Sequence, residues 1–552
     1  MSSHSDTLTS GLVRDVIPYD RLPWIRPLVA ATTHDFSAVA SLFAGDPADP
    51  AAWQATIDRV TRQSRPHAAI AEVVQAQLAR RHAPARARAA AAELATPGAV
   101  AVVTGQQAGV FGGPLYTLLK AVTTIQYARA AQARHGVPVV PVFWVDADDH
   151  DWDEIRAAHL LDRDYAPVTV TAGDLPGAGS QPVGALAFDA GIDQVLDDLA
   201  ARLTPTEFTP AVLDTLRAHY RAGQSPAAAC AGWIEALLGS EGLVVFEASD
   251  PAAKRFTADV FARELATPGE TARLAREAGT RMADGGHTAQ VVPGDDVVCL
   301  FRVDETGRRP LRCRDGHVTV DGHEWSVDDL RAEMTAHPDR FSPNVLLRPL
   351  VQDTIFPTVC YIAGPSELAY HAQLGPVYAA FGIERPLVAS RASATLVDAA
   401  ALRFFDRHPV ALEALQPQDE SVLNHLLALQ MPAEVEAAFT AFETAIAGQA
   451  SRIGEAAALV DATLAGAAET TVTRMRETLA SLHGKVLQAS KKKDETLRRQ
   501  FIRTRNLTFP EGHPQERFLS LTYFVNRYGL DLGTRLIDGL PLPADAHYVV
   551  VP

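Results

Sequence analysis

Two polar segments in the first half of the chain carry side chains that can do chemistry, and each follows a predicted buried strand. The segment 104–109 (TGQQAG) follows the apolar run 100–103, and the acidic segment 146–154 (DADDHDWDE) follows the apolar run 137–145. The carboxyl ends of parallel strands line the ligand crevice of an open sheet. We therefore expect both segments to share the mouth of one pocket.

The glutamine-glycine segment contains neither GxGxxG nor GxxxxGK[ST]. This argues against standard NAD binding and P-loop ATP hydrolysis. Gln106 and Gln107 offer donors and acceptors that suit a polyhydroxylated or amino-acid substrate, and we predict both as substrate-binding. The alternative is a tight connection whose glycines serve only the turn, although such a turn needs no carboxamides. On the helix that follows Pro114, we also predict Tyr116 and Lys120 as substrate-binding, although a lone helix lysine is more often simply exposed.

The acidic segment has three interpretations. Its carboxylates could hold a hard cation through oxygen. They could instead bind a substrate amine or sugar hydroxyls, with His150 or an aspartate as base. The third interpretation is a solvated loop, which the mutual repulsion of so many carboxylates at a strand end disfavours. We predict catalytic roles for Asp149, His150 and Asp151 and substrate contacts for Asp148 and Glu154; whether a metal is bound stays open.

A second small-residue loop, Gly364-Pro365-Ser366-Glu367, joins a predicted strand to a helix in the second half of the chain. Arginines near such a loop suit bidentate recognition of a carboxylate, although each could equally form a structural ion pair. The substrate-binding residues predicted here are Arg348, Gln352, Ser366, Glu367, Tyr370 and Arg391.

The repeated strand–loop–helix pattern predicts an α/β fold: a Rossmann-like parallel sheet interrupted by two insertions and followed by a C-terminal α-helical coiled coil. Hydrophobic residues at heptad spacing, from Ile446 to Ala467 and again from Val472 to Val486, predict the coiled coil. The predicted divisions are a helical lead-in to the core (1–97), the first half of the core (98–160), a first insertion (161–235), the core continued (236–267), a strand-rich second insertion (268–343), the second half of the core (344–400), the coiled-coil region (401–509) and a segment that packs back on the body (510–552).

Composition limits the class of protein. The 552 residues carry 50 Lys and Arg against 66 Asp and Glu, a net charge of −16, which argues against nucleic acid as a partner. The four cysteines form no CxxC pair, so we expect neither a disulfide framework nor a structural zinc site. Apolar runs fall short of the ~20 residues of a membrane helix, and the N-terminus lacks the pattern of a signal peptide. We therefore expect a cytoplasmic protein.

Taken together, the sequence resembles the BshC family, the cysteine-adding enzymes of bacillithiol biosynthesis, over nearly the whole chain. The resemblance rests on TGQQAG with Gly113-Pro114-Leu115-Tyr116-Thr117 and Lys120, on Pro141-Val142-Phe143-Trp144 followed by Asp149-His150-Asp151 and Glu154, and on Arg348-Pro349-Leu350, Phe356-Pro357, Gly364-Pro365, Phe509-Pro510, Gln515-Glu516-Arg517 and Tyr528-Gly529.

The resemblance implies a ligase that joins L-cysteine to the amine of glucosaminyl-malate, the last step towards the low-molecular-weight thiol bacillithiol, in a homodimer formed through the coiled coil. An amide made from a free carboxylate needs activation. The chain has no HxGH motif, and Ser490-Lys491-Lys492-Lys493 is not a convincing KMSKS, so either ATP or ADP with Mg²⁺ serves through other residues or the cysteine arrives activated.

The resemblance also implies a separate nucleotide site in the coiled-coil region. Its candidate residues are Lys491, Arg498, Arg505 and Arg517, although the basic run that contains the first three is most simply a solvated helix face. Two rival functions stay open: a non-catalytic sugar-metabolite-binding or scaffold protein, and a sugar nucleotidyltransferase.

Overall fold

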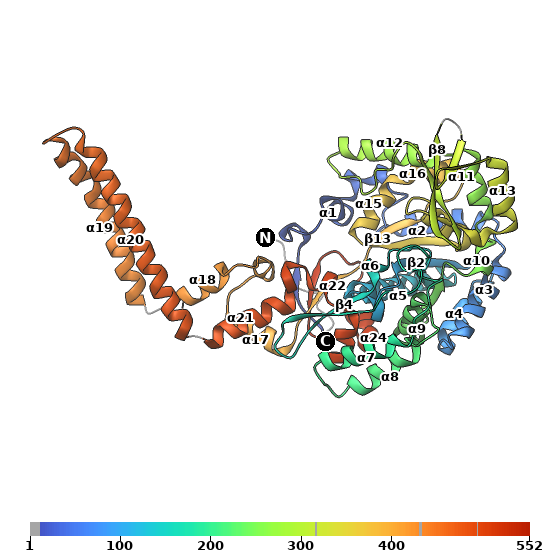
Figure 1. Cartoon of the computed structure of the whole chain (residues 1–552), viewed down its shortest axis with the longest axis horizontal. Coiled ribbons are helices and arrows are strands. Elements are labelled where there is room, and N and C mark those ends of the chain that lie inside the picture. Colours follow the sequence, from blue (N-terminus) through green and yellow to red (C-terminus); the bar gives the residue numbers. More distant parts are fainter. Residues whose placement is uncertain (1–10, 315–316, 430–432, 494) are drawn as a thin grey trace. The chain divides into compact units, whose positions relative to one another are not determined.

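The computed structural model describes residues 11–314, 317–429, 433–493 and 495–552, and the chain forms two compact units (Figure 1). The first unit combines Met1–Val397 with Pro514–Pro552, and the second is Asp398–His513. The first contains a Rossmann-like parallel sheet and the second a helical coiled coil, so the predicted fold class is confirmed.

A five-stranded parallel sheet forms the centre of the first unit. Its strands, in spatial order, are β13 (Leu387–Ser390), β12 (Thr358–Ala363), β2 (Val100–Gln107), β3 (Val139–Asp146) and β6 (Val244–Glu247). Most of their residues are buried, as in parallel strands covered on both faces. The chain order runs outward from β2 in both directions, so the ligand crevice is expected at the carboxyl ends of β2 and its neighbours.

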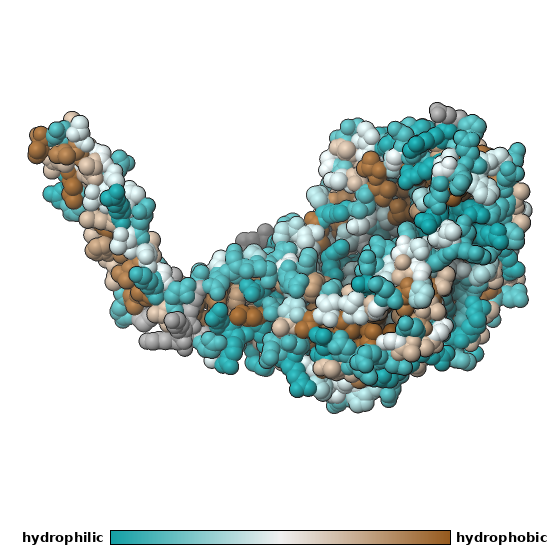
Figure 2. Space-filling view, viewed as in Figure 1, coloured by the Kyte–Doolittle hydropathy of each residue, from teal (hydrophilic) through white to brown (hydrophobic). Residues whose placement is uncertain are grey.

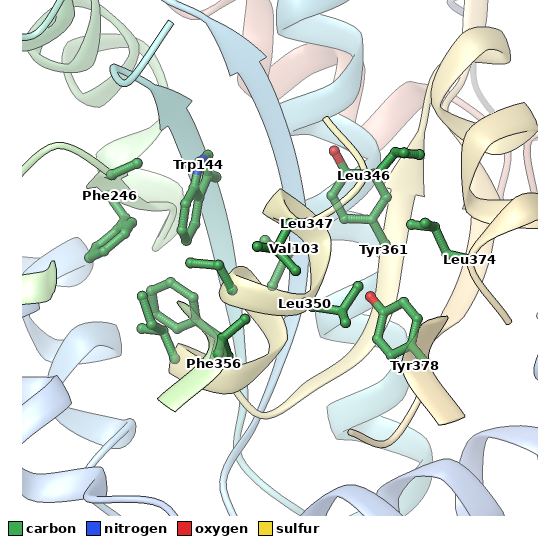
Figure 3. Packing of buried hydrophobic residues seen from close by; sticks show 14 of the residues in the cluster. Val103, Trp144, Phe246, Leu346, Leu347, Leu350, Phe356, Tyr361, Leu374 and Tyr378 are labelled. Carbon is green, nitrogen blue, oxygen red and sulfur yellow. The ribbon is translucent and has the colours of Figure 1, made fainter. Parts of the chain in front are cut away.

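Helices cover both faces of this sheet. On one face, α2 (Pro50–Arg62) and α5 (Leu115–His135) bring Trp53 and Tyr127 against the strands. The other face carries a larger apolar cluster, in which Leu350 of α14 (Arg348–Ile355) packs near Val103 and Tyr361 (Figure 3). The helix that bears Arg348 is therefore fixed to the sheet by its apolar residues.

Further α-helices of this unit are α1 (Pro27–His34), α3 (His67–Arg80), α4 (Ala85–Glu93), α6 (Trp152–Ile155), α7 (Gly191–Arg202), α8 (Thr209–His219), α9 (Pro226–Leu238), α10 (Pro251–Lys254), α11 (Ala258–Ala266), α12 (Glu270–Asp284), α13 (Val327–Ala336), α15 (Pro365–Gln373), α16 (Gly375–Phe381), α22 (Gln515–Phe518), α23 (Leu521–Tyr528) and α24 (Leu532–Gly539). Among the described residues, no helix is both long and apolar enough to cross a lipid bilayer.

Three smaller sheets complete the unit. An antiparallel sheet has the order β10 (His323–Trp325), β9 (His317–Val320), β8 (Gly307–Arg314), β7 (Val297–Asp304) and β11 (Phe341–Pro343). A hairpin pairs β4 (Ala157–Leu161) with β5 (Pro167–Thr171). The third sheet, β1 (Val13–Ile17), β15 (His547–Val550) and β14 (Ser393–Leu396), joins the two ends of the described chain.

The glutamine-glycine segment differs from its predicted loop form. Strand β2 continues through Gln107 because β3 offers a hydrogen-bonding partner along its whole length, with Gln107 opposite Asp146. Gln106 and Gln107 are thus the last two residues of a strand. A strand end holds side chains more firmly than a loop, and it aims alternate residues to opposite faces of the sheet.

The second unit contains α17 (Ala399–Arg407), α18 (Ser421–Leu429), α19 (Ala433–Ala458), α20 (Leu464–Lys493) and α21 (Glu495–Thr508). Helices α19 and α20 lie side by side as an antiparallel hairpin (Figure 1), in which His483 contacts Glu436 at 2.9 Å. The prediction of one continuous seam from Ile446 to Ala467 is wrong, because the chain reverses after Ala458 and Asp461 accepts hydrogen bonds from Thr463 before α20 begins.

Candidate active site

A cavity of about 710 Å³ opens where β2, β3 and β12 end. That volume suits a small-molecule ligand. Both predicted segments border it, together with residues from the second insertion and from α22. The polar side chains that line it are Gln106, Gln107, Tyr116, Lys120, Asp146, Asp149, His150, Glu154, Gln290, Arg308, Asn344, Arg348, Tyr361, Ser366, Glu367, Tyr370, Arg391 and Arg517.

Gln107 organises the acidic part of the cavity. Its Nε2 atom donates hydrogen bonds to Asp149 (3.1 Å) and Glu154 (2.7 Å). Burial tends to raise the pKa of the Asp149 carboxyl, but the Gln107 amide and the Arg308 guanidinium outweigh it and the pKa is lowered. Burial raises the pKa of Glu154. We name Asp146, Asp149 and Glu154 the acidic wall.

Asp146 ends β3 directly opposite Gln107. Unlike Asp149, its carboxyl has no hydrogen-bond or ion-pair partner within the described parts of the chain, and it lines the cavity. Burial raises its pKa to about 6; the Arg348 guanidinium opposes this shift, and the neighbouring carboxylate of Asp149 adds to it. The cavity therefore holds a carboxyl group that changes charge not far below neutral pH.

Arg308 enters the cavity from β8, and no local sequence pattern singles it out. Its Nη1 atom lies 3.2 Å from Nδ1 of His150 and 3.4 Å from Oδ1 of Asp149. The neighbouring Arg309 instead pairs with Asp321 at 3.2 Å. Two adjacent arginines on one strand point to opposite faces, so only the register of the insertion decides which one reaches the site.

Lys120, on α5, links the end of β2 to the first turn of α15. Its Nζ atom donates hydrogen bonds to the Gly105 carbonyl (2.6 Å) and to Oε1 of Gln106 (2.9 Å), and it forms an ion pair with Glu367. Burial lowers the pKa of Lys120, opposed by the Glu367 carboxylate. Because three acceptors meet three N–H donors, the ammonium is already satisfied within the protein.

Arg348 is likewise bound within the protein. Its guanidinium donates to Oε1 of Gln352 (3.1 Å) and to the hydroxyl of Tyr370 (3.2 Å). Tyr361, which sequence reasoning missed, donates its hydroxyl hydrogen to Glu367 (2.6 Å). Gln352 is buried and outside the lining, so it supports Arg348 from behind.

Two arginines lie against the ring of Tyr116, with guanidinium carbons 5.4 Å (Arg391) and 5.9 Å (Arg517) from its centroid. Arg391 donates two hydrogen bonds to the carboxylate of Glu516. The guanidinium of Arg517 forms no hydrogen bond or ion pair within the described residues, and Arg517 lines the cavity. Its guanidinium is therefore available to a ligand.

Asp148, Asp151 and Gln352 are predicted site residues that do not line the cavity. Asp148 forms a buried ion pair with Lys254 at 2.5 Å. Asp151 is the N-cap of α6, where its carboxylate accepts a hydrogen bond from the Glu154 N–H (3.1 Å). The geometry gives these two carboxylates roles in holding the acidic segment rather than contact with a ligand.

No three His, Cys, Asp or Glu side chains in the described ranges are grouped so that they could hold a metal ion. The cavity lining contains no cysteine. Burial raises the pKa of the Cys230 thiol to about 12 and also raises that of Cys360. The chemistry of the lining is therefore that of carboxylates, imidazole, carboxamides and guanidinium groups.

Comparison with known sequences identifies the family. Residues 16–392 match the family described as "Bacillithiol biosynthesis BshC, N-terminal Rossmann-like domain", and residues 394–551 match "Bacillithiol biosynthesis BshC, C-terminal coiled-coil domain". The chain belongs to the BshC family. Curated relatives carry the name "Putative cysteine ligase BshC". One from Salinibacter ruber is 33% identical over 522 residues, covering 94% of each chain. One from Koribacter versatilis is 31% identical over 441 residues, covering 80% of this chain and 82% of the relative.

The residues for which the BshC resemblance predicts a nucleotide site are divided between the units. Arg517 belongs to the first unit, whereas Arg498 and Arg505 lie on α21 of the second. Arg505 donates to the Asp419 carbonyl (3.2 Å), and Arg498 lies 4.0 Å from Glu420. The side chain of Lys491 lies outside the described part of the structure. The nucleotide site stays a prediction.

Proposed function

We propose that this member of the BshC family joins L-cysteine to the amine of glucosaminyl-malate in the last step of bacillithiol biosynthesis. The observation that carries the proposal is the pairing of opposite charges in one cavity: the acidic wall and the free guanidinium of Arg517. A substrate that carries both an amine and carboxylates needs both kinds of group. Cysteine is the substrate that the name of the relatives supplies.

The acidic wall suits an amine nucleophile. The lowered pKa of Asp149 keeps this carboxylate ionised at neutral pH, so that it can hold an ammonium group. The raised pKa values of Asp146 and Glu154 suit carboxyl groups that accept the proton the amine loses as its nitrogen attacks a carbonyl carbon. Asp149 and His150 keep their predicted catalytic roles in this proposal, whereas Asp151 holds α6.

Arg517 suits the malate end of the substrate. A guanidinium that faces an open cavity can take a carboxylate with two parallel hydrogen bonds. Arg391 and Arg348 already donate to Glu516, Gln352 and Tyr370, so they add positive charge and hold the lining in place. Gln106 is used by Lys120 and Tyr116, which leaves the Oε1 atom of Gln107 for a sugar hydroxyl.

Activation of cysteine is the part of the reaction that the lining does not supply. Joining a carboxylate to an amine requires a leaving group on the carbonyl carbon, and the lining has no cysteine to form a thioester. The two predicted sources are ATP with Mg²⁺ and a cysteine that is already activated when it binds. The test of the proposed function therefore includes both.

The test is the formation of bacillithiol by the purified full-length chain. Glucosaminyl-malate is supplied with L-cysteine alone, with L-cysteine, ATP and Mg²⁺, or with cysteinyl adenylate, and the products are measured by mass spectrometry. We expect bacillithiol in at least one arm and its loss with Asp149→Asn. The proposal fails if a folded protein forms none in any arm. Release of pyrophosphate from a sugar-1-phosphate and a nucleoside triphosphate would identify the nucleotidyltransferase instead.

We also propose that the α19–α20 hairpin joins two copies into a homodimer. Apolar side chains of the hairpin remain largely exposed in one copy, among them Ile453 (55%), Met475 (53%) and Leu482 (51%). Figure 2 shows apolar surface on this hairpin. A groove of about 590 Å³ is lined by Ala438, Phe439, Phe442, Thr471, Arg474, Met475, Thr478, Leu479 and Leu482. Exposed apolar surface of this kind marks an interaction site.

A further inference from the structure

The imidazole of His150 faces a cation at one ring nitrogen. Nδ1 lies 3.2 Å from Nη1 of Arg308 and 3.5 Å from Oδ1 of Asp149. A guanidinium has N–H donors and no acceptor, so a hydrogen bond between the two requires Nδ1 to be the acceptor. If Nδ1 carried the proton, two donors would face each other at 3.2 Å. The neutral ring then carries its proton on Nε2.

Arg308 is held too firmly to turn away from His150. Its Nε atom donates to Oγ of Ser342 (2.9 Å), and its Nη2 atom donates to the Pro343 carbonyl (2.8 Å). Its guanidinium carbon lies 3.7 Å from the centroid of the Phe301 ring. Only Nη1 is left for the acidic segment, so the contact with His150 is set by the second insertion.

The carboxylate of Asp149 is not placed to accept a hydrogen bond from a proton on Nδ1 of His150. Its Oδ1 atom already accepts a hydrogen bond from the backbone N–H of His150 (2.8 Å) and faces Nη1 of Arg308 (3.4 Å). A distance of 3.5 Å to Nδ1 is longer than an ordinary N–H···O hydrogen bond. The opposite nitrogen, Nε2, has no partner within the described residues and is not a buried atom, so it is open to a ligand in the cavity that His150 lines.

We propose that Arg308 is a positioning residue that keeps His150 in the tautomer with the proton on Nε2, so that His150 donates a hydrogen bond to the reacting carbonyl group instead of acting as the base. The proposal rests on the proposed function and assigns a role to each of the two side chains. It also separates two tasks: the acidic wall handles the proton of the amine, and His150 stabilises charge.

The bond changes follow from this division. The lone pair of the substrate amine forms a C–N bond with the carbonyl carbon of an activated cysteinyl group, which is an acyl phosphate or an acyl adenylate. The C=O π electrons move to the oxygen, which accepts a hydrogen bond from Nε2–H of His150. The amine proton passes to a carboxylate of the acidic wall. The C=O bond then re-forms, the bond to the phosphate leaving group breaks with its electrons, and His150 ends the step unchanged.

The tautomer is measured without any assay of activity. The full-length protein is labelled with ¹⁵N-histidine, and long-range proton–nitrogen correlation spectra assign His150 by its loss in His150→Gln. We expect the Nε2–H pattern in the unmodified protein and a mixture of tautomers in Arg308→Met, whereas Arg309→Met should leave the pattern unchanged. An Nδ1–H pattern in the unmodified protein, or no response to Arg308→Met, would overturn the proposal even if the protein makes bacillithiol.

Kinetics test the donor role with a matched pair of substitutions. A glutamine amide nitrogen can occupy the position of Nε2, and an asparagine amide nitrogen the position of Nδ1. A donor role predicts that His150→Gln retains at least about tenfold more kcat/KM than His150→Asn, in line with the effect of one transition-state hydrogen bond. It also predicts that kcat/KM of His150→Gln still falls at acid pH, so that the acid limb of the pH profile is kept. Equal activity of the two variants, or loss of that limb, would overturn the donor role of His150.

Discussion

Arg391 and Glu516, which are 125 positions apart in sequence, form a buried ion pair through two parallel hydrogen bonds of 2.8 and 3.0 Å. Each side chain is 4% exposed. Ser393 and the backbone N–H of Ala394 also donate to the same carboxylate. The pair fastens α22, which carries Arg517, to the segment after β13, so the cavity lining depends on a contact made by the C-terminal segment.

Replacement of Glu516 by glutamine should strongly destabilise the first unit, because it leaves the Arg391 guanidinium buried without its counter-charge. Loss of one partner of a buried ion pair typically costs about 3–5 kcal/mol. All six tryptophans belong to the first unit, so their fluorescence during urea unfolding reports on that unit. We expect the unfolding midpoint to fall well below that of the unmodified protein.

The matched control is Glu384→Gln, which breaks the half-exposed pair with Arg59. Such a pair contributes about 0–1 kcal/mol. Equal midpoints for Glu516→Gln and Glu384→Gln would mean that the buried pair does not hold the C-terminal segment.

The stabilisation by the Arg391–Glu516 pair should also depend on pH. Burial tends to raise the pKa of the Glu516 carboxyl, but Arg391 and the hydrogen bonds outweigh it and the pKa is lowered from its ordinary 4.5. A lowered folded-state pKa contributes stability that is present above about pH 4.5 and is lost as the pH falls towards the folded-state value. The destabilisation caused by Glu516→Gln should therefore shrink as the pH falls through this range.

The raised pKa of Asp146 predicts that the free energy of unfolding changes with pH in the opposite direction. Its pKa is raised from 3.8 to about 6, so the folded state binds a proton more tightly than the unfolded chain and stability falls as the pH rises through that window. The shift corresponds to at most about 3 kcal/mol, and because the carboxyl borders an open cavity we expect about 1 kcal/mol. Asp146→Asn should raise the unfolding free energy above pH 6 and change it little near pH 4.

Asp164→Asn serves as the control for Asp146→Asn, because Asp164 is exposed in the loop between β4 and β5. Urea unfolding at several pH values measures both variants. A stabilisation that is the same at pH 4 and pH 7 would show that the Asp146 carboxyl is not the group that titrates.

The course of the chain through the central sheet could be predicted from the sequence. The Val-rich runs that became β2 and β3 and the helix that ends at Gly136 follow local patterns. The sequence predicts Lys120 near the crevice from its place on the helix after Pro114, and Arg348 and Arg391 from their nearness to the second strand–helix loop. What the sequence could not show is which of their N–H donors are already used, since the acceptors Glu367, Tyr370 and Glu516 lie on other elements.

Arg308 and Asp151 illustrate two different limits. Arg308 reaches the cavity only through the register of β8 within its antiparallel sheet, which no local pattern fixes. Asp151 stands beside Asp149 and His150 in sequence, but α6 begins at Trp152 and draws the Asp151 carboxylate to its first turn as an N-cap. The same four-residue helix turns Glu154 towards Gln107.

Arg517 should determine the preference for a substrate with carboxylates. Arg517→Gln removes a charge-assisted contact worth about 1.5–3 kcal/mol, so we expect KM for glucosaminyl-malate to rise about 10- to 100-fold with little change in kcat. The kcat/KM for glucosamine, which lacks the malate, should be unaffected. Arg163→Gln, an exposed arginine outside the cavity lining, is the control. Equal losses for both sugars would mean that Arg517 shapes the cavity without binding malate.

The α19–α20 hairpin predicts how the chain associates. The residues of the predicted seam on α20 differ in exposure. Leu479 is buried within one copy, whereas Met475 and Leu482 are about half exposed. Met475→Glu with Leu482→Glu places two charges on the groove and should convert a dimer into a monomer in sedimentation velocity.

Because these residues belong to the second unit, the urea midpoint reported by tryptophan fluorescence should not change. Glu477→Lys, at an exposed position of α20, is the control for a change of charge outside the groove. A dimer that survives the double substitution would place the contact elsewhere, and a monomeric unmodified chain would refute the dimer itself.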